Sequence, residues 1–435
     1  MTTADASELA LPKTITTGLG PSRRGMLSAI GPGVIAGASD DDPSGIGTYS
    51  QVGAQFGFGM LWTMLFSFPL MSAVQMISGR IGRTTGHGIA GNVRRNYPAS
   101  ILYAIVGLLL VANIINIGAD IGAMGAALQL LLGGPQFLYV VAIAALSVAL
   151  QVFIPYHRYV RWLRWLTVSL FAYVLAAVVV AVPWGEALRA TVVPSFQFNA
   201  AYLAAFIAVL GTTISPYLLF WQASQEVEDV EARTDEAPLK SAPEQAPVAL
   251  RRIRLDTLLG MGFSNVVAWA IILTAAATLH AHGETDITTA EQAAKALEPL
   301  AGRLAFVLFA AGIVGTGLLA IPVLAGSAAY GVGEALAWPV GLERKPRRAR
   351  GFYAVIAVAT VVGATQAFLH VNPIKALFWT AVINGVVAVP VLVVMMLVSG
   401  NPKIMGDLAV GGWLKALGWL TTLVMLAAAV GMFVT

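Results

Sequence analysis

Three consecutive carboxylates at positions 40–42 stand directly before Pro43, inside an apolar stretch that starts at Met26. A charged side chain at bilayer depth costs about 2.5–3.5 kcal/mol on insertion scales. Pro43 has no N–H to donate, and Gly45 and Gly47 loosen the backbone further, so a helix here should unwind. Unwinding frees backbone carbonyls beside the carboxylates, and such a group of oxygens forms a pocket for a cation.

The alternative is that the helix begins at Pro43 and leaves the acids in water. Against it, residues 30–38 are apolar, and Arg23 and Arg24 already mark the cytoplasmic edge of the helix. We therefore expect the break to lie within the membrane.

A second mid-helix proline, Pro216, follows Ser215 in the stretch from Gly211 to Tyr217. Taken alone, a proline in a membrane helix is equally well explained as a simple kink. It falls, however, in the first helix of the second half of the chain, and so matches the break at Pro43. Paired interruptions at corresponding places are typical of transporter sites built on inverted repeats.

The elements that must position these residues are membrane helices. Of the 435 residues, 57% are hydrophobic and 11% are charged, whereas soluble domains carry about 25% charged residues. Cysteine is absent, which excludes disulfides, thiolate metal sites and cysteine nucleophiles. The net charge of +4 is explained by basic cytoplasmic loops rather than by nucleic-acid binding. No nucleophile–base pair or histidine-rich metal site indicates an enzyme.

Apolar runs long enough to cross a bilayer predict an all-α integral membrane protein with eleven spans. The spans are expected at about 26–52, 57–79, 100–131, 136–155, 163–182, 200–224, 256–280, 300–332, 351–369, 374–397 and 414–433. With the N-terminus in the cytoplasm, the inside segments carry 22 Lys and Arg residues and the outside segments carry 4. This bias supports the orientation, an odd number of spans and a C-terminus on the outside.

The same map divides the chain into a cytoplasmic tail, residues 1–25, and a single transmembrane domain, residues 26–433. Residues 225–255 run from acidic through Ala/Pro-rich to basic, which is typical of a flexible cytoplasmic linker. The expected parts of the domain are a first repeat at about 26–182, a second repeat at about 200–397 and an extra helix at about 414–433.

At its two breaks the sequence resembles the natural-resistance-associated macrophage protein family, Nramp, of divalent-metal transporters. Gly31-Pro-Gly33 followed by Asp42-Pro43 is similar to the family's first-helix signature, Asp-Pro-Gly-Asn. The stretch 211–217 is similar to its sixth-helix signature, in which Met-Pro-His follows Ala-Thr-Val, and residues 403–406 after the tenth span also fit. The resemblance covers nearly the whole chain. It implies a LeuT-type fold of two inverted five-helix repeats that works by alternating access.

The departures from the family pattern change the expected cargo. The family implies a metal held by the Asp and Asn of helix 1 and by a Met sulfur and an Ala carbonyl of helix 6. Here Asp42 matches the Asp, whereas Gly45, Ser215 and Thr212 stand at the Asn, Met and Ala positions, and Tyr217 replaces the His. Oxygen ligands suit Mg²⁺, Ca²⁺ and Mn²⁺, and small residues leave room for the waters that Mg²⁺ retains. The sequence is thus similar to the Nramp-related magnesium-transporting branch.

Helix 3 predicts transport without the family's usual proton route. Coupled members carry an Asp and a Glu at positions that are Ala119 and Gly122 here. Asp120 is one residue off, about 100° around the helix, and is either a substitute relay residue or a buried carboxylate paired elsewhere. Asn384 stands near the family's metal-facing Gln, as either a ligand or a helix–helix hydrogen-bonding group. Asn116 is predicted to be a packing residue.

We therefore predict a transporter of divalent metal cations, with Mg²⁺ or Mn²⁺ favoured, in a bacterial-type inner membrane. Asp42 is the expected primary ligand, and Asp41 or Asp40 adds charge at the site or at its cytoplasmic mouth. The shell is completed, partly through water, by carbonyls near Gly45 and Thr212, by the Ser215 hydroxyl and by Asn384. No catalytic residue and no bound cofactor is predicted. The expected partners are the cation, as substrate, and the lipid bilayer, and a monomer is compatible with the sequence.

Two rival functions fit the same scaffold. One is transport of a small organic substrate such as an amino acid, whose carboxylate small hydroxyls near a helix break can bind. The three acids argue against it, since they repel an anion. The other is a metal-binding sensor that no longer transports.

Overall fold

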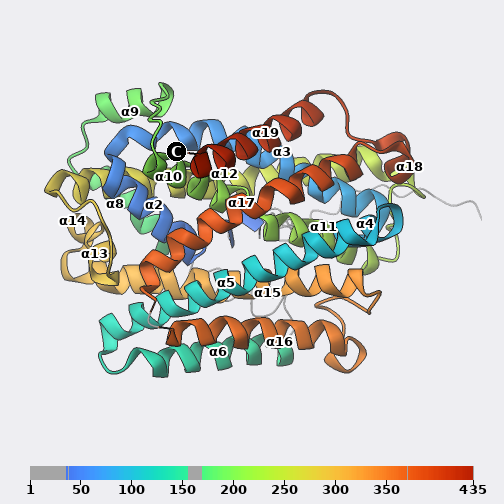
Figure 1. Cartoon of the computed structure of the whole chain (residues 1–435), viewed down its shortest axis with the longest axis horizontal. Coiled ribbons are helices and arrows are strands. Elements are labelled where there is room, and N and C mark those ends of the chain that lie inside the picture. Colours follow the sequence, from blue (N-terminus) through green and yellow to red (C-terminus); the bar gives the residue numbers. More distant parts are fainter. Residues whose placement is uncertain (1–35, 38, 155–168, 370, 435) are drawn as a thin grey trace, which may run out of the picture. The chain divides into compact units, whose positions relative to one another are not determined.

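The chain is helical, with connecting loops and no β-strand, over the residues that a computed structural model describes, 36–37, 39–154, 169–369 and 371–434. Eight of its helical segments are long and apolar enough to cross a membrane. A ninth candidate is a pair of helices joined at a bend of 108°. About 20 apolar residues span the hydrocarbon core of a bilayer, so these segments are a multi-pass membrane domain (Figure 1).

The longest helices have between 18 and 34 residues. They are α3 (Trp62–Thr85), α5 (Ala99–Leu132), α6 (Gln136–Phe153), α12 (Ala246–Thr278), α15 (Ala305–Ala335), α17 (Pro373–Ser399) and α19 (Gly412–Val434). The shorter α-helices are α2 (Pro43–Phe56), α4 (Ile89–Asn96), α8 (Phe171–Val179), α9 (Trp184–Val192), α10 (Ala200–Thr213), α11 (Pro216–Glu231), α13 (Ala290–Lys295), α14 (Glu298–Ala301), α16 (Arg350–Thr365) and α18 (Pro402–Met405). Short 3-10 turns are η2 (Gly57–Met60), η4 (Pro243–Gln245), η5 (His280–His282), η6 (Gly302–Leu304), η7 (Pro346–Arg348), η8 (Gln366–Phe368) and η9 (Gly406–Leu408).

These bounds agree with most of the predicted spans. Eight predicted spans each coincide with one of the long apolar segments, among them α10 and α11, which together form one interrupted span. The first two predicted spans correspond to α2 and α3, the bent pair, and residues 26–35 of the first span lie outside the described residues. Of the fifth predicted span, only the part that includes α8 is described.

The predicted flexible linker over residues 225–255 is corrected by the structure. Helix α11 extends into it as far as Glu231, and α12 already begins at Ala246. Between them Leu239 is fully buried, and its N–H donates to the backbone oxygen of Arg83 at 3.1 Å. The Arg83 guanidinium pairs with Glu236 at 3.1 Å. The segment is therefore docked against the end of α3, an arrangement that its composition did not reveal.

Helix α2 lies in the middle of the domain, in contact with α5, α10, α12, α15 and α17. Helices α5 and α15 pack along each other, and α6 and α16 lie at one edge beside them (Figure 1). Because α2 is surrounded by other helices, a polar group at its first turn is removed from water and lipid alike.

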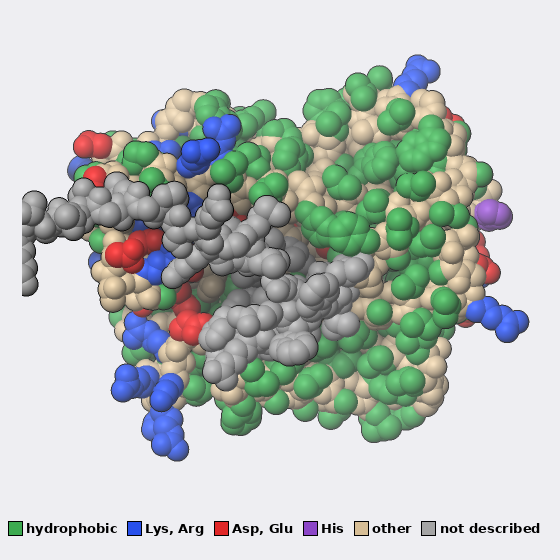
Figure 2. Space-filling view, turned by 180° about the vertical axis from the view of Figure 1, so that it is seen from behind, with side chains coloured by type: hydrophobic (Ala, Val, Ile, Leu, Met, Phe, Trp, Pro, Cys, Tyr) green, Lys and Arg blue, Asp and Glu red, His purple; other side chains and the backbone are tan. Residues whose placement is uncertain are grey.

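Apolar side chains cover the flanks of the domain. Phe153, Val178 and Leu259 are among the many large hydrophobic residues that are more than two-thirds exposed. Figure 2 shows broad apolar areas between two edges where charged side chains gather. An apolar surface of this extent needs lipid rather than water around it.

Candidate cation site

The predicted break in the first helix is present. Residues 39 and 40 are helical, 41 and 42 are not, and α2 begins at Pro43. Asp42 is the N-cap of α2: its Oδ1 accepts from the backbone N–H of Gly45 at 2.8 Å and from the hydroxyl of Ser44 at 2.6 Å. Proline at the first helical position and an aspartate N-cap explain why the helix starts here. One side of the Asp42 carboxylate is thereby held by its own helix.

The second predicted break is also present, between α10, which ends at Thr213, and α11, which begins at Pro216. Ser215 is the N-cap residue, but its hydroxyl lies 2.7 Å from the carbonyl oxygen of Thr212 and so turns back onto α10. The Thr212 hydroxyl donates to the Tyr49 hydroxyl at 2.7 Å. In the described structure neither hydroxyl is hydrogen-bonded to Asp42, although both line the same break.

The two breaks meet at the second oxygen of Asp42. Its Oδ2 accepts from the hydroxyl of Tyr217, on the first turn of α11, at 3.2 Å. It also accepts from the Asn116 amide, on α5, at 3.2 Å. Asn116, predicted as a polar packing residue, thus forms hydrogen bonds between helices, and one of them is to the central carboxylate.

Asn116 links two further side chains, Asp120 and Asn384, to this carboxylate. Its Nδ2 also donates to Asp120 Oδ2 at 3.0 Å, one turn along α5. Its Oδ1 accepts from the Asn384 amide of α17 at 2.7 Å. Asn384 thus reaches Asp42 only through Asn116. Of the two alternatives for Asn384, the structure has the helix–helix hydrogen bond.

Asp40 and Asp41 face a different helix. The Ser264 hydroxyl of α12 lies 2.5 Å from Asp40 Oδ2 and 3.2 Å from Asp41 Oδ1. The three consecutive acids therefore separate, with two directed at α12 and Asp42 directed at α5 and α11.

The site is deeply buried and rich in carboxyl groups. Asp40, Asp41, Asp42 and Asp120 are each at most 1% exposed. Among the described residues, none of them forms an ion pair with Lys or Arg, and Asp40 Oδ1, Asp41 Oδ2 and Asp120 Oδ1 accept no hydrogen bond. Burying unpaired carboxylates is costly unless a cation or protons compensate them. The arrangement can hold a cation with carboxylate, amide and carbonyl oxygens. Within the described part of the chain, no three His, Cys, Asp or Glu side chains lie close enough together to hold a metal ion, so a cation here would also need amide, hydroxyl, carbonyl or water ligands.

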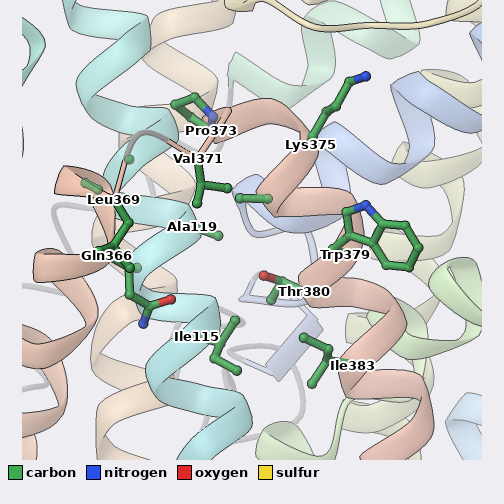
Figure 3. A pocket seen from close by; sticks show the side chains of 14 residues that line it. Ile115, Ala119, Gln366, Leu369, Val371, Pro373, Lys375, Trp379, Thr380 and Ile383 are labelled. Carbon is green, nitrogen blue, oxygen red and sulfur yellow. The ribbon is translucent and has the colours of Figure 1, made fainter.

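A cavity of about 210 Å³ lies on another face of α5, between this helix, η8 and the start of α17 (Figure 3). Ala119 and Gly122 line it, together with Thr380 and Ile383 of α17. Asp120 does not line it. The one-residue offset therefore directs this carboxylate at Asn116 and Asp42 instead of at the cavity.

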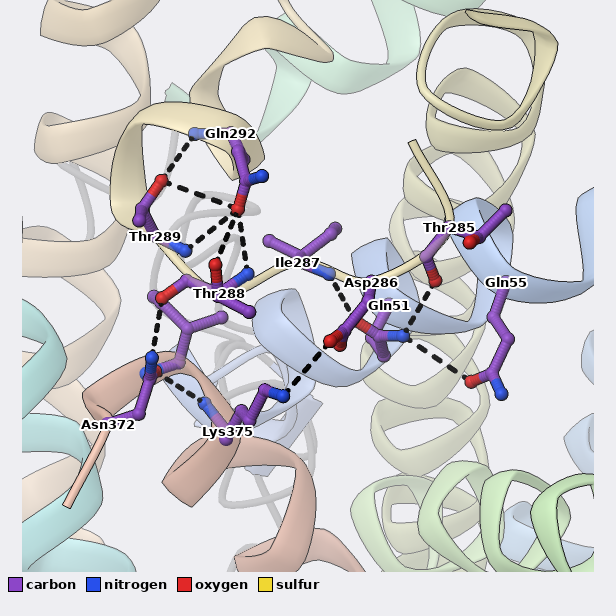
Figure 4. Close-up of polar contacts among 11 residues, drawn as sticks. Gln51, Gln55, Thr285, Asp286, Ile287, Thr288, Thr289, Gln292, Asn372 and Lys375 are labelled. Carbon is purple, nitrogen blue, oxygen red and sulfur yellow. Dashed lines mark hydrogen bonds and ion pairs between the residues drawn. The ribbon is translucent and has the colours of Figure 1, made fainter. Parts of the chain in front are cut away.

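The far end of α2 is tied to the loop before α13 and to the first turn of α17 (Figure 4). The Gln51 side chain accepts from the backbone N–H of Ile287 at 2.8 Å and donates to the backbone oxygen of Thr285 at 3.2 Å. Lys375 of α17 forms an ion pair with Asp286 of the same loop at 3.0 Å. These contacts join α2, the loop before α13 and α17 at that end of the domain.

Comparison with known proteins identifies the family to which this chain belongs. A family model described as natural resistance-associated macrophage protein-like matches residues 33–435, which include both breaks and every described helix. The chain belongs to the Nramp family. Nramp proteins are transporters, so the prediction that this chain is not an enzyme is confirmed.

Named relatives cover almost the whole Nramp chain. The divalent metal cation transporter MntH of Pectobacterium carotovorum is 26% identical over 421 residues, 95% of each protein. MntH of Xanthomonas campestris is 29% identical over 410 residues, 92% of this chain and 88% of its own length.

Two solved structures share the fold. The manganese transporter of Eremococcus coleocola is 18% identical, with a TM-score of 0.74 over 94% of this chain and 86% of that one. Mhp1, a nucleobase-cation-symport-1 family transporter, is 14% identical, with a TM-score of 0.58 over 93% of this chain and 91% of its own. These likenesses show an all-helical membrane protein with a LeuT-like fold, which the resemblance implied.

Some residues at this Nramp site were not predicted from the sequence. The spacing of Asn116 and Asp120, four apart on one helix, puts them on a common face, and this signal was available. Ser264 carried no such signal, since a lone serine in an apolar helix is common. Its contact with Asp40 depends on how α12 packs against α2.

Proposed function

We propose that this protein transports divalent metal cations across a membrane by alternating access, with Mg²⁺ or Mn²⁺ as the favoured substrates. The observation that carries the proposal is a buried carboxylate, Asp42, at the point where two broken helices of an Nramp chain meet. The relatives named as divalent metal cation transporters and the manganese transporter of the same fold support it. Asp42 is the proposed primary ligand.

A hard cation is favoured by the donors around Asp42. The side chains that contact it are those of Ser44, Asn116 and Tyr217, and each offers oxygen or nitrogen and no sulfur. Oxygen-rich sites suit Mg²⁺ and Mn²⁺, whereas thioether sulfur selects softer ions. These donor atoms support the proposal that the chain is similar to the magnesium-transporting branch of Nramp.

The remaining ligands in the proposal come from the two breaks. Gly45 donates its backbone N–H to Asp42 and adds no side chain beside this carboxylate. The other proposed contributors are the carbonyls near Thr212, the Ser215 hydroxyl, Asn384 through Asn116, and Asp40 and Asp41 as added charge.

The proposed architecture has eleven spans, two inverted five-helix repeats at about 26–182 and 200–397, and an extra helix at about 414–433. The N-terminal tail, residues 1–25, lies in the cytoplasm and the C-terminus outside. The excess of 22 over 4 basic residues on the cytoplasmic side supports this orientation.

Transport is proposed to proceed without the usual proton route of the family. The residues at the relevant helix 3 positions, Ala119 and Gly122, carry no titratable group and line an apolar cavity. Flux of the cation should therefore carry no protons across the membrane. The internal pH should stay unchanged, except for any shift that the membrane potential drives.

The test is flux of Mg²⁺, Mn²⁺ and Ca²⁺ into proteoliposomes that contain a pH-sensitive dye. We expect saturable uptake of Mg²⁺ or Mn²⁺ and its loss in Asp42→Ala. Uptake with normal affinity in that variant would contradict the proposal. Metal binding without any flux in the wild-type protein would favour a sensor.

A further inference from the structure

A second buried carboxyl group, that of Asp120 on α5, lies close to Asp42. A single amide nitrogen, Nδ2 of Asn116, donates to Asp42 Oδ2 at 3.2 Å and to Asp120 Oδ2 at 3.0 Å. Asp120 also lies close to the backbone N–H of Ser44, in the first turn of α2. The two carboxylates therefore face each other across one NH₂ group.

The opposed carboxylates leave acceptor capacity unused. Asp120 Oδ1 has no hydrogen-bond partner among the described residues, and neither has Asn384 Oδ1 on α17. Both side chains are 0% exposed. Orphaned buried oxygens on two different helices, both joined to Asn116, indicate that a positively charged group or ordered water belongs between them.

A purely structural role explains Asp120 poorly. Asn113, on the same face of α5, shows what such a role looks like: its Nδ2 donates to the backbone oxygen of Leu324 at 2.9 Å and to the Ser327 hydroxyl at 2.8 Å, and its unpartnered Oδ1 carries no charge. Those bonds join α5 to α15 through neutral groups. Asp120 instead brings a carboxyl group to Asp42 with no basic partner in the described part of the chain, and ionising both carboxyl groups there without a cation would be costly.

We propose that Asp120 is a second carboxylate ligand of the transported cation, opposite Asp42, either directly or through one of the ion's waters. The assignment rests on the function proposed above. Two carboxylates balance the charge of one divalent ion, and hard divalent cations are commonly held by carboxylates together with retained waters. The Asn116 amide fills the space between the carboxylates in the cation-free state and turns its oxygen toward the ion when the ion arrives.

The experiment is Mn²⁺ binding to the purified full-length chain by calorimetry, with Asp120→Asn and Asp42→Asn compared with wild type. Removing one ligand should raise the Kd of Asp120→Asn at least about tenfold, since even outer-shell partners of a metal change its affinity 10–100-fold. The matched control is Asp407→Asn, which makes the same chemical change at an exposed position in η9 and should leave Kd within about twofold. An Asp120→Asn protein with wild-type Kd would overturn the assignment.

Failure of the proposed function gives a different result. In that case wild type itself shows no saturable Mn²⁺ binding, or Asp42→Asn binds as wild type does. If Asp120→Asn does not fold, Asp120→Glu keeps the charge and moves it by one methylene. For this variant we expect a changed ratio of Mn²⁺ to Ca²⁺ affinity, measured by the rise in melting temperature with each ion. An unchanged ratio would count against Asp120 as a ligand.

Discussion

The crossing of α10 and α17 holds the second break in place, and Gly211→Ala tests it. A Cβ at position 211 would lie 2.0 Å from the carbonyl oxygen of Ala381 and 2.5 Å from the amide nitrogen of Gly385. Both neighbours are backbone atoms, so no side chain can rotate to make room. The helices must move apart, and overpacking of this kind costs about 1–3 kcal/mol. We expect the upper end of that range, because small residues are what allow membrane helices to approach this closely.

The same change should reach the proposed site. The carbonyl oxygen of Gly211 lies 2.8 Å from the Ser215 hydroxyl, so a displaced α10 shifts the residues of the break. We therefore expect Gly211→Ala to lower the melting temperature in detergent, followed by tryptophan fluorescence, and to raise KM for Mn²⁺ uptake. Gly385→Ala approaches the same contact from α17, where its Cβ would lie 2.5 Å from the Ile207 carbonyl oxygen. The double variant should lose less stability than the two single losses combined, because both disrupt one contact.

Gly107→Ala is the matched control. Position 107 lies within α5, and nothing lies within 4 Å of an added Cβ. Alanine there should stabilise the helix by about 0.5–1 kcal/mol, since glycine loses more conformational freedom on folding. If Gly211→Ala melted at the wild-type temperature and kept its KM, the close packing of α10 on α17 would be refuted.

Two further predictions concern other contacts. Lys375→Gln removes the ion pair with Asp286; the two side chains are 47% and 62% exposed. Because such exposed pairs contribute about 0–1 kcal/mol, uptake should change less than about fivefold. A double-mutant cycle with Asp286→Asn that gave a coupling energy well above about 1 kcal/mol would contradict this expectation. Ser264→Ala removes the hydroxyl shared by Asp40 and Asp41 and should lower stability by about 1–3 kcal/mol, because it leaves buried carboxyl oxygens without their hydrogen-bond donor. Ser241→Ala, at an exposed hydroxyl, should leave the melting temperature unchanged, and equal melting of the two variants would count against the role of Ser264.

The sequence predicted helices well where a local property decides them. Length and hydropathy located spans such as the one that is now α5, because a bilayer requires a continuous apolar run. Composition failed in residues 225–255, where an acidic and Ala/Pro-rich segment suggested a solvated linker. That segment is ordered by partners far away in sequence, including Arg83 and the backbone of α3, and composition carries no information about such partners.

The sequence by itself determined the two helix breaks and the carboxylate beside the first. Pro43 and Pro216 lack an N–H in any fold, and Asp42 caps the residues that follow it. These features therefore depend only on the local sequence. Only the tertiary structure decided what faces Asp42. Asn116 is 74 residues away in sequence, and Asn384 is 268 residues from Asn116. Contacts over such separations depend on which helix faces pack together, and pairing two carboxylates across one amide is a consequence of that packing rather than of any local motif.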